Sequence, residues 1–413
     1  MRPVIGIDVS KGESEGFILL ERNKPYGKPF RFQHTHEEMN ILLLKLQEVE
    51  TLVGLRPVVV LESTGHYHLG IVAVLQKKGY EVITLNPLIP QRARKSKLRK
   101  VKTDAEDAKH LAELFYKEEL QAAPSRPLEQ DELRFLCRQH EMISHTYVQA
   151  QLNFQSILDQ LFPLYSNIFG QLFSKTALEV LRKHPTPEHV LITSHGELET
   201  IIRTHCNRSM SWASHKADAI ICATKNSLIV DYSPSQVRAL LLMISLLMEY
   251  QKHLADLEQA IKIKATSIQG FDLLRSIPGI GDKLASSILA EIGDISSFPH
   301  AKKLVAFAGI DPSVFSSGKF AATKNHITKR GSSRLRRALY LAVLCGIRGA
   351  VRNENIRNFM TRRGLKESLT GLHLLLAPIN YCISFSPCLK NRFITALPNP
   401  LKKDNFTQNS IFH

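Results

Sequence analysis

The sequence predicts an α/β domain at the N-terminus, two long helices after it and a mainly helical region towards the C-terminus. Over the first 90 residues, short apolar runs alternate with stretches of helical spacing. In order they give three strands, a helix, a strand, a helix and a strand, at 4–9, 16–20, 29–33, 39–49, 57–61, 70–78 and 81–85. Two longer apolar repeats, and helical patterns from residue 273 onwards, account for the rest.

The order of elements in the N-terminal domain is typical of a ribonuclease-H-like fold, and two of its strands end on acids. Asp8 lies at the end of the first strand, and Glu62 directly follows the run 57–61. Gly6 has no side chain, so another group can approach the backbone closely there. Because these strand ends should converge, we expect Asp8 and Glu62 to lie close together.

A helix that begins at Thr103 adds two more acids, Asp104 and Asp107, on one face. Thr103 and Glu106 have the spacing of a capping box, so Glu106 is interpreted as a cap residue. Acids in the first turn of a helix also interact favourably with the helix dipole. That effect would explain Asp104 or Asp107 alone, but not the acids at the ends of two strands. Four clustered carboxylates suit Mg²⁺ or Mn²⁺, and two such ions would clamp the oxygens of a phosphodiester exchange.

Seven cations fall within the twelve residues 91–102, directly before this acidic helix. They are Arg92, Arg94, Lys95, Lys97, Arg99, Lys100 and Lys102. A run of charge is usually only a solvated face, but its position here suggests phosphate held beside a metal site. The whole chain carries 54 Lys and Arg against 38 Asp and Glu, a net charge of +16, which favours a polyanionic partner.

Several classes of protein are disfavoured by composition. The six cysteines are scattered without a C-x-x-C pair, so a disulfide framework or a zinc site is not expected and a reducing compartment fits. The N-terminus has a strand pattern rather than that of a signal peptide. The apolar run 240–247 is too short to span a bilayer. We therefore expect a soluble intracellular protein without a membrane partner.

Two apolar repeats, 133–161 and 240–261, alternate spacings of three and four residues and predict two long helices that pair. The pairing could lie within one chain or across a dimer, and a buried hairpin without a partner is equally compatible. His140 lies in the first repeat and is interpreted as a polar residue that sets register rather than as a ligand. The intervening insert, about 163–234, has no functional interpretation.

The C-terminal third contains Ile-Pro-Gly-Ile-Gly at 277–281, a helix-hairpin-helix pattern. Its glycines, Gly279 and Gly281, would let backbone N–H groups approach a DNA phosphate, although a plain helical corner also fits. A later helix has Leu335, Leu339 and Ala342 on its inner face and Ser332 or Ser333 as its cap. The candidate nucleic-acid contacts around it are Lys329, Arg330, Arg334 and Arg337, with the three arginines predicted to form one basic stripe.

Two sets of motifs resemble one known family. Segments 6–11 (Gly-Ile-Asp-Val-Ser-Lys), 61–65 (Leu-Glu-Ser-Thr-Gly), 86–87 (Asn-Pro) and 102–108 are similar to the N-terminal domain of DEDD-type transposases of the IS one-ten insertion-sequence family. Segments 277–281, 307–309 (Phe-Ala-Gly), 317–318 (Ser-Gly) and 328–331 (Thr-Lys-Arg-Gly) resemble the C-terminal domain of that family.

The resemblance implies a RuvC-like domain that binds Mg²⁺ through Asp8, Glu62, Asp104 and Asp107. It also implies a serine nucleophile, which corresponds to Ser317 because that serine directly precedes glycine. Family members act on DNA as dimers or tetramers joined through a coiled coil, and use a structured guide RNA from the element. A cytoplasmic, nucleoid-associated protein of a bacterial or archaeal cell is expected.

The predicted domains are therefore a metal-binding domain at 1–125, coiled-coil helices with the insert at 126–265, a transposase domain at 266–350 and a divergent tail at 351–413. The insert and the tail depart from the family pattern, and the tail puts the activity of this copy in doubt. Two other functions stay open: a Mg²⁺-dependent junction nuclease that does not use Ser317, and a non-catalytic nucleic-acid-binding relic.

Overall fold

The structure is a computed structural model that describes residues 1–63, 65–85, 90, 103–118, 120, 127–227, 232–298, 300–311, 316–317, 320–321 and 327–348. The chain divides into two compact units, Met1–Ser125 and Arg126–His413, which are described separately below. Among the described residues, no helix combines the length and the apolar character needed to cross a membrane.

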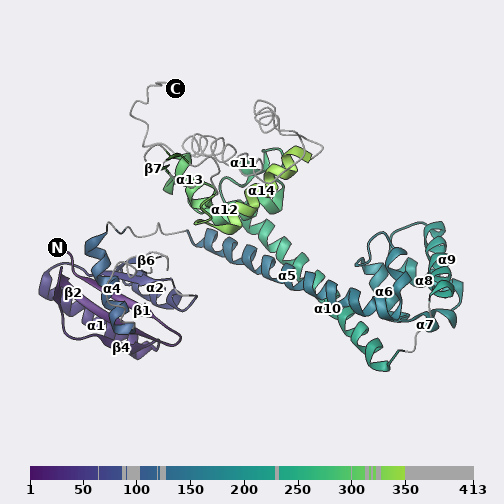
Figure 1. The fold of residues 1–413 in the computed structure, drawn as a ribbon, viewed down its shortest axis with the longest axis horizontal. Helices are drawn as coiled ribbons and strands as arrows, with labels where there is room; N and C mark the ends of the chain where they lie inside the picture. The colour runs from purple at the N-terminus through teal and green to yellow at the C-terminus, as the bar shows by residue number, and fades with distance from the viewer. Residues whose placement is uncertain are drawn as a thin grey trace, which may run out of the picture. The chain divides into compact units, whose positions relative to one another are not determined.

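The first unit is built on a mixed sheet (Figure 1). Its strands are β1 (Val4–Val9), β2 (Glu13–Glu21), β3 (Lys24–Pro25), β4 (Phe30–Gln33), β5 (Val58–Glu62) and β6 (Glu81–Leu85). Strand β1 is antiparallel to β2 and parallel to β5, which is parallel to β6, while β4 pairs antiparallel with β2. The predicted order of strands and helices is confirmed, and the exposed two-residue β3 is an addition that no apolar pattern marked.

Strand alternation gives the sheet two apolar faces. Ile5, Ile7 and Val59 pack with helices α1 (His36–Val53) and α2 (His68–Lys77). On the opposite face, Val4, Val58 and Val60 pack with helix α4 (Asp104–Lys117). The first unit is therefore a three-layer arrangement in which, among the described helices, α4 covers the face of the sheet that carries the candidate acids.

The second unit contains the two predicted long helices, α5 (Leu128–Leu161) and α10 (Pro234–Thr266), which pack along each other (Figure 1). Their hydrogen-bonded partners run in opposite directions along the two helices. They are Gln160 with Gln236 at 3.2 Å, Tyr147 with Gln251 at 2.8 Å and His140 with Glu258 at 3.2 Å. The helices thus pair within one chain, as an antiparallel hairpin, and His140 makes a polar cross-helix contact as the sequence suggested.

The insert between these helices shares one hydrophobic core with the hairpin. Its elements are η1 (Pro163–Asn167), α6 (Lys175–Lys183), α7 (Pro187–Leu191), α8 (His195–Thr204) and α9 (Met210–Asn226). Tyr165 is fully buried there, and its hydroxyl donates a hydrogen bond to the carbonyl oxygen of Ala177 at 2.8 Å. Phe154 of α5 and Ile244 of α10 belong to the same core, so the insert packs on the hairpin that carries it.

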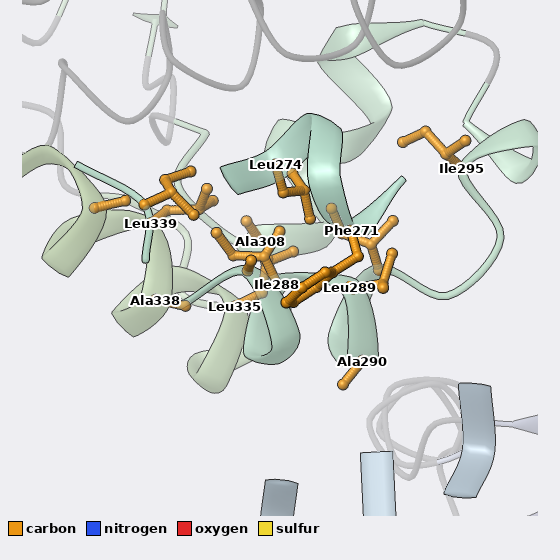
Figure 2. Packing of buried hydrophobic residues seen from close by; sticks show 14 of the residues in the cluster. Phe271, Leu274, Ile288, Leu289, Ala290, Ile295, Ala308, Leu335, Ala338 and Leu339 are labelled. Carbon is orange, nitrogen blue, oxygen red and sulfur yellow. The ribbon is translucent and has the colours of Figure 1, made fainter. Parts of the chain in front are cut away.

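A compact helical domain follows α10. Its described elements are α11 (Phe271–Arg275), α12 (Asp282–Ile292), η2 (Ile295–Ser297), α13 (Ala301–Ala308), β7 (Ser316–Ser317), β8 (Phe320–Ala321) and α14 (Ser333–Arg348). Figure 2 shows Phe271, Ile288 and Leu335 among the side chains that fill its core. The predicted inner face of α14 is confirmed, because Leu335, Leu339 and Ala342 are all buried.

Candidate functional site

Gly6 fixes the distance between β1 and α4. A Cβ atom built on Gly6 would lie 2.1 Å from the carbonyl oxygen of Ala108 and 2.5 Å from the amide nitrogen of Ala112. Any larger residue would therefore collide with the backbone of α4. The prediction that a group approaches the backbone at Gly6 is confirmed, and the group that does so is a helix of the same unit.

A hydrogen bond at the other end of α4 sets its direction. The hydroxyl of Tyr116, in the last turn, donates to the carbonyl oxygen of Arg2, just before β1, at 2.7 Å. Burial raises the pKa of this phenol to about 12, so it stays a donor at neutral pH. Since the last turn of α4 lies at the start of β1, its first turn lies towards the end of β1, where Asp8 is found.

Asp8 and Glu62 lie side by side on that same face. The parallel register of β1 and β5 pairs Ile7 with Leu61, so the next position along each strand brings Asp8 beside Glu62. Side chains alternate along a strand, so Asp8 points to the same face as Val4, which lies an even number of positions before it and packs against α4. In β5, Glu62 points to the same face as Val58 and Val60, which also pack against α4. Both carboxylates therefore face the layer occupied by α4.

The first turn of α4 contributes the other two acids. The hydroxyl of Thr103 accepts a hydrogen bond from the amide of Glu106 at 3.2 Å, which confirms Thr103 as the N-cap. Asp104 is exposed, and Asp107, which directly precedes Ala108, is only 7% exposed. Four carboxylates from three elements thus share one edge of the sheet.

The donor set of these acids fits a hard divalent cation, because all its potential ligands are carboxylate oxygens. As placed, however, no three His, Cys, Asp or Glu side chains among the described residues come close enough to hold a metal ion. The predicted basic run at 91–102 and the Asn-Pro pair at 86–87 lie outside the described residues.

Ser317 belongs to the second unit, in the short antiparallel ladder of β7 with β8, where it pairs with Phe320. The chain on either side of this ladder is closed by a set of bonds that we call the clasp, formed by Asp311 and Thr328. The Thr328 hydroxyl donates to Oδ1 of Asp311 at 2.6 Å, and the Thr328 amide donates to the Asp311 carbonyl at 2.9 Å. The clasp therefore fixes both ends of the segment that carries Ser317.

Two further contacts extend the clasp. The amide of Lys329 donates to the carbonyl of Gly309 at 3.0 Å, and the amide of Ser332 donates to the carbonyl of Phe307 at 2.8 Å. A Cβ atom on Gly331 would lie 1.9 Å from that Phe307 carbonyl oxygen, so only glycine fits. The motif segments 307–309 and 328–331 are therefore in contact, and their glycines allow the two backbones to meet.

Glu291 was not predicted from the sequence, yet it links this region to the long hairpin. Its carboxylate is 5% exposed and accepts hydrogen bonds from Arg138 of α5 at 3.0 and 3.3 Å and from the hydroxyl of Ser332 at 2.9 Å. Burial alone would raise the pKa of Glu291, but the hydrogen bond and charge of Arg138, together with Arg134, lower it below its ordinary value. The sequence feature that could have identified Glu291 is its position as the one acid within the otherwise apolar run 288–292.

The predicted nucleic-acid contacts near the C-terminus are placed as follows. Gly279 has φ of +98°, and a Cβ atom there would lie 2.5 Å from the amide nitrogen of Gly346, so its close approach is to α14. Nothing lies within 4 Å of the same position at Gly281, the N-cap of α12. Lys329, with φ of +53°, lies in the exposed stretch before α14.

The predicted stripe of three arginines is corrected in one respect. Ser332 caps α14 by accepting a hydrogen bond from the amide of Leu335 at 3.2 Å, so the helix starts at Ser333. Arg330 precedes the helix and lies in the segment pinned to Phe307 and Gly309, and only Arg334 and Arg337 share a helical face. Both of these arginines form ion pairs with Glu141 of α5.

In the comparison with known proteins, two family models match separate parts of this chain. A DEDD transposase model of the IS110 type matches residues 5–163. A second model, for transposases of the IS116/IS110/IS902 family, matches residues 271–360. The chain belongs to the IS110 family of transposases.

Curated relatives match over parts of their length. The transposase for insertion sequence element IS1111A of Coxiella burnetii is 29% identical over 37% of this chain and 43% of its own length. An uncharacterized protein of insertion element IS116 from Streptomyces clavuligerus is 25% identical over 58% of this chain and 60% of its own. A pilin gene-inverting protein of Moraxella bovis is 42% identical over 17% of this chain and 21% of its own. The chain thus spans less than two thirds of each.

Proposed function

We propose that this protein is a transposase that cuts and rejoins DNA by serine attack on phosphodiesters, assisted by divalent cations. The observation that carries the proposal is the position of the four acids at one end of the mixed sheet, two at strand ends and two in the first turn of α4. Asp8 and Glu62 come from adjacent parallel strands, and Asp104 and Asp107 from the helix turn above them. Family membership supports DNA as the substrate.

The four acids would hold Mg²⁺ or Mn²⁺, which would neutralise charge on the reacting phosphate and on the oxygens around it. Gly6 allows α4 to pack closely against β1, and Thr103 caps the first turn of α4. Together they would fix the position of the helix acids relative to the strand acids. To hold a metal ion together, the acid side chains would have to turn towards a common centre.

Ser317 would be the nucleophile. Its Oγ would form a bond to phosphorus while the bond from phosphorus to the leaving nucleoside oxygen breaks. The serine hydroxyl loses its proton and the leaving oxygen gains one, so the number of phosphodiester bonds is conserved and the DNA can be rejoined. A serine hydroxyl is a weak nucleophile and needs activation, which is why we assign it to the same reaction as the acids of the first unit.

The family resemblance also supports finer proposals about partners. We propose that a structured guide RNA binds together with DNA, since the net charge of +16 provides for more than one polyanion. A dimer or tetramer joined through the coiled-coil region is proposed as the active form, with action at the nucleoid.

The test is an assay for covalent protein–DNA adducts and strand transfer on a DNA substrate that carries the ends of the element, with its RNA. Ser317→Ala should abolish adducts while DNA binding survives. Asp8→Asn should abolish both adducts and strand transfer, and removal of divalent cations by a chelator should do the same until Mg²⁺ or Mn²⁺ is restored. Undiminished adducts in Ser317→Ala would reject the serine role.

A second function is favoured by one observation: the four acids all lie in the first unit, whereas Ser317 lies in the second. A junction nuclease that uses only the acids and water would need Mg²⁺ and would be indifferent to Ser317. It predicts that Ser317→Ala cleaves junction DNA at the wild-type rate and that Asp8→Asn does not.

A further inference from the structure

Two arginines of α14 converge on one carboxylate of α5. Arg334 binds Oε2 of Glu141 through Nε, and Arg337 approaches Oε1 through an Nη atom at 3.5 Å. Arg334 is 45% exposed, Arg337 is 62% exposed and Glu141 is 26% exposed. One acid thus holds two guanidinium groups at the surface of the second unit.

These three residues line a groove of about 680 Å³ between α5, α10, α12 and α14. The other cations of the groove are paired within it as well: Arg138 with Glu291 at 3.0 Å, Lys283 with Glu258 at 2.6 Å and Lys262 with Asp282 at 3.3 Å. An anion that enters the groove must therefore displace a carboxylate from its cation.

The Glu141 pair is the one whose geometry suits exchange for a phosphate. Guanidinium groups recognise phosphate and carboxylate oxygens in the same forked manner, whereas an ammonium group is a point charge. Glu291 is ruled out as the displaced acid because it is buried and also bonded to Ser332. Glu258 is held by His140 as well as by Lys283. Among the described residues, Glu141 forms ion pairs with Arg334 and Arg337, both of which are exposed.

We propose that Arg334 and Arg337 form a subsite for a nucleic-acid phosphodiester, and that Glu141 occupies this subsite until nucleic acid displaces it. Binding at the subsite therefore exchanges two protein ion pairs for two arginine–phosphate contacts. Glu141 lowers the affinity for any polyanion and thereby discriminates against weak, non-specific binding. The inference rests on the proposed function only in taking nucleic acid as the partner.

The test measures equilibrium binding of the full chain to two probes with equal numbers of phosphates, a duplex DNA and an RNA hairpin, over a series of salt concentrations. Exposed ion pairs contribute little, so Glu141→Gln should raise affinity by about 2- to 30-fold. The slope of log affinity against log salt concentration should also become steeper, by about the amount that one additional phosphate contact contributes. A gain with DNA alone assigns the subsite to the substrate, and a gain with RNA alone assigns it to the guide.

Two comparisons make the result specific. Asp131→Asn changes the charge of α5 by the same amount at an exposed position outside the groove and should leave affinity nearly unchanged. In an Arg334→Ala, Arg337→Ala background, the effect of Glu141→Gln should disappear. Equal affinities for Glu141→Gln and wild type, or a gain that persists without the arginines, would overturn the proposal. Because only binding is measured, loss of strand transfer for other reasons does not affect the outcome.

Discussion

Replacing Gly6 by alanine should separate the two pairs of acids. The new methyl carbon would lie 2.1 Å from the Ala108 carbonyl oxygen and 2.5 Å from the Ala112 amide nitrogen, both backbone atoms of α4. Ordinary contacts begin near 3.4 Å, so α4 must move away from β1 by about 1 Å. Asp104 and Asp107 move with the helix, whereas Asp8 and Glu62 stay with the sheet.

The cost to folding follows from the same collision. Overpacking a tight interior contact typically costs about 1–3 kcal/mol, and here neither collision partner is a side chain that can rotate away. We therefore expect Gly6→Ala to lower the free energy of unfolding by about 2–3 kcal/mol. Strand transfer should fall more than the folded fraction does, because a misplacement of about 1 Å disturbs the alignment of metal and phosphate that the proposed mechanism requires.

The assay combines chemical denaturation of the full chain with strand transfer across a Mg²⁺ titration. Gly70→Ala is the matched control, since the same substitution in helix α2 of the same unit meets nothing within 4 Å and should be neutral or stabilising. If Gly6→Ala kept the wild-type unfolding midpoint and Mg²⁺ dependence, the placement of α4 over the strand ends would be wrong.

Two further predictions concern the second unit. Glu291→Ala leaves the partly exposed Arg138 and Arg134 without their buried partner and should lower the free energy of unfolding by about 1–3 kcal/mol in chemical denaturation. Because the folded-state pKa of Glu291 is lowered, its stabilisation is present above the ordinary value of 4.5 and is lost as pH falls through the folded value, so wild type and Glu291→Gln should converge in strong acid. Thr328→Val removes the side-chain bond of the clasp but keeps the backbone one, and should cost about 1.5–3 kcal/mol while reducing covalent adducts. Adducts at the wild-type rate in Thr328→Val would show that the clasp does not position Ser317.

Much of the fold could be predicted because the spacing of apolar residues and the ends of strands can be recognised within short stretches of sequence. Strand 4–9 and strand 81–85 were predicted to the residue, since each is a short apolar run with polar neighbours. The direction of the α5–α10 pair could not be predicted, because an apolar seam specifies that a helix pairs but not with which partner or in which direction. The cross-helix contacts of Gln160, Tyr147 and His140 supply that information.

The candidate site was predictable to a different extent in each unit. Asp8 and Glu62 were found because an acid at the end of an apolar strand is conspicuous, and parallel pairing then brings the two together. Glu291 was missed because a charge inside an apolar helix run gives no indication of its partner, and Arg138 lies 153 residues earlier. The predicted stripe of arginines included Arg330 although Ser332 was one of the two expected caps, because residue spacing does not show that the chain before the cap is bonded to Phe307 and Gly309.

Glycines show most clearly what sequence can and cannot specify. At Gly6 and Gly279 the sequence indicates that some group comes close to the backbone, and at both positions, as also at Gly331, the structure shows such a group. At all three the group is the protein's own backbone: α4, α14 and the chain at Phe307. Close approach by a ligand and close approach by a helix have the same steric requirement, so glycine alone cannot distinguish them. Gly281 differs because nothing lies within 4 Å of it, which leaves it, rather than Gly279, as the glycine of the 277–281 motif available to a phosphate.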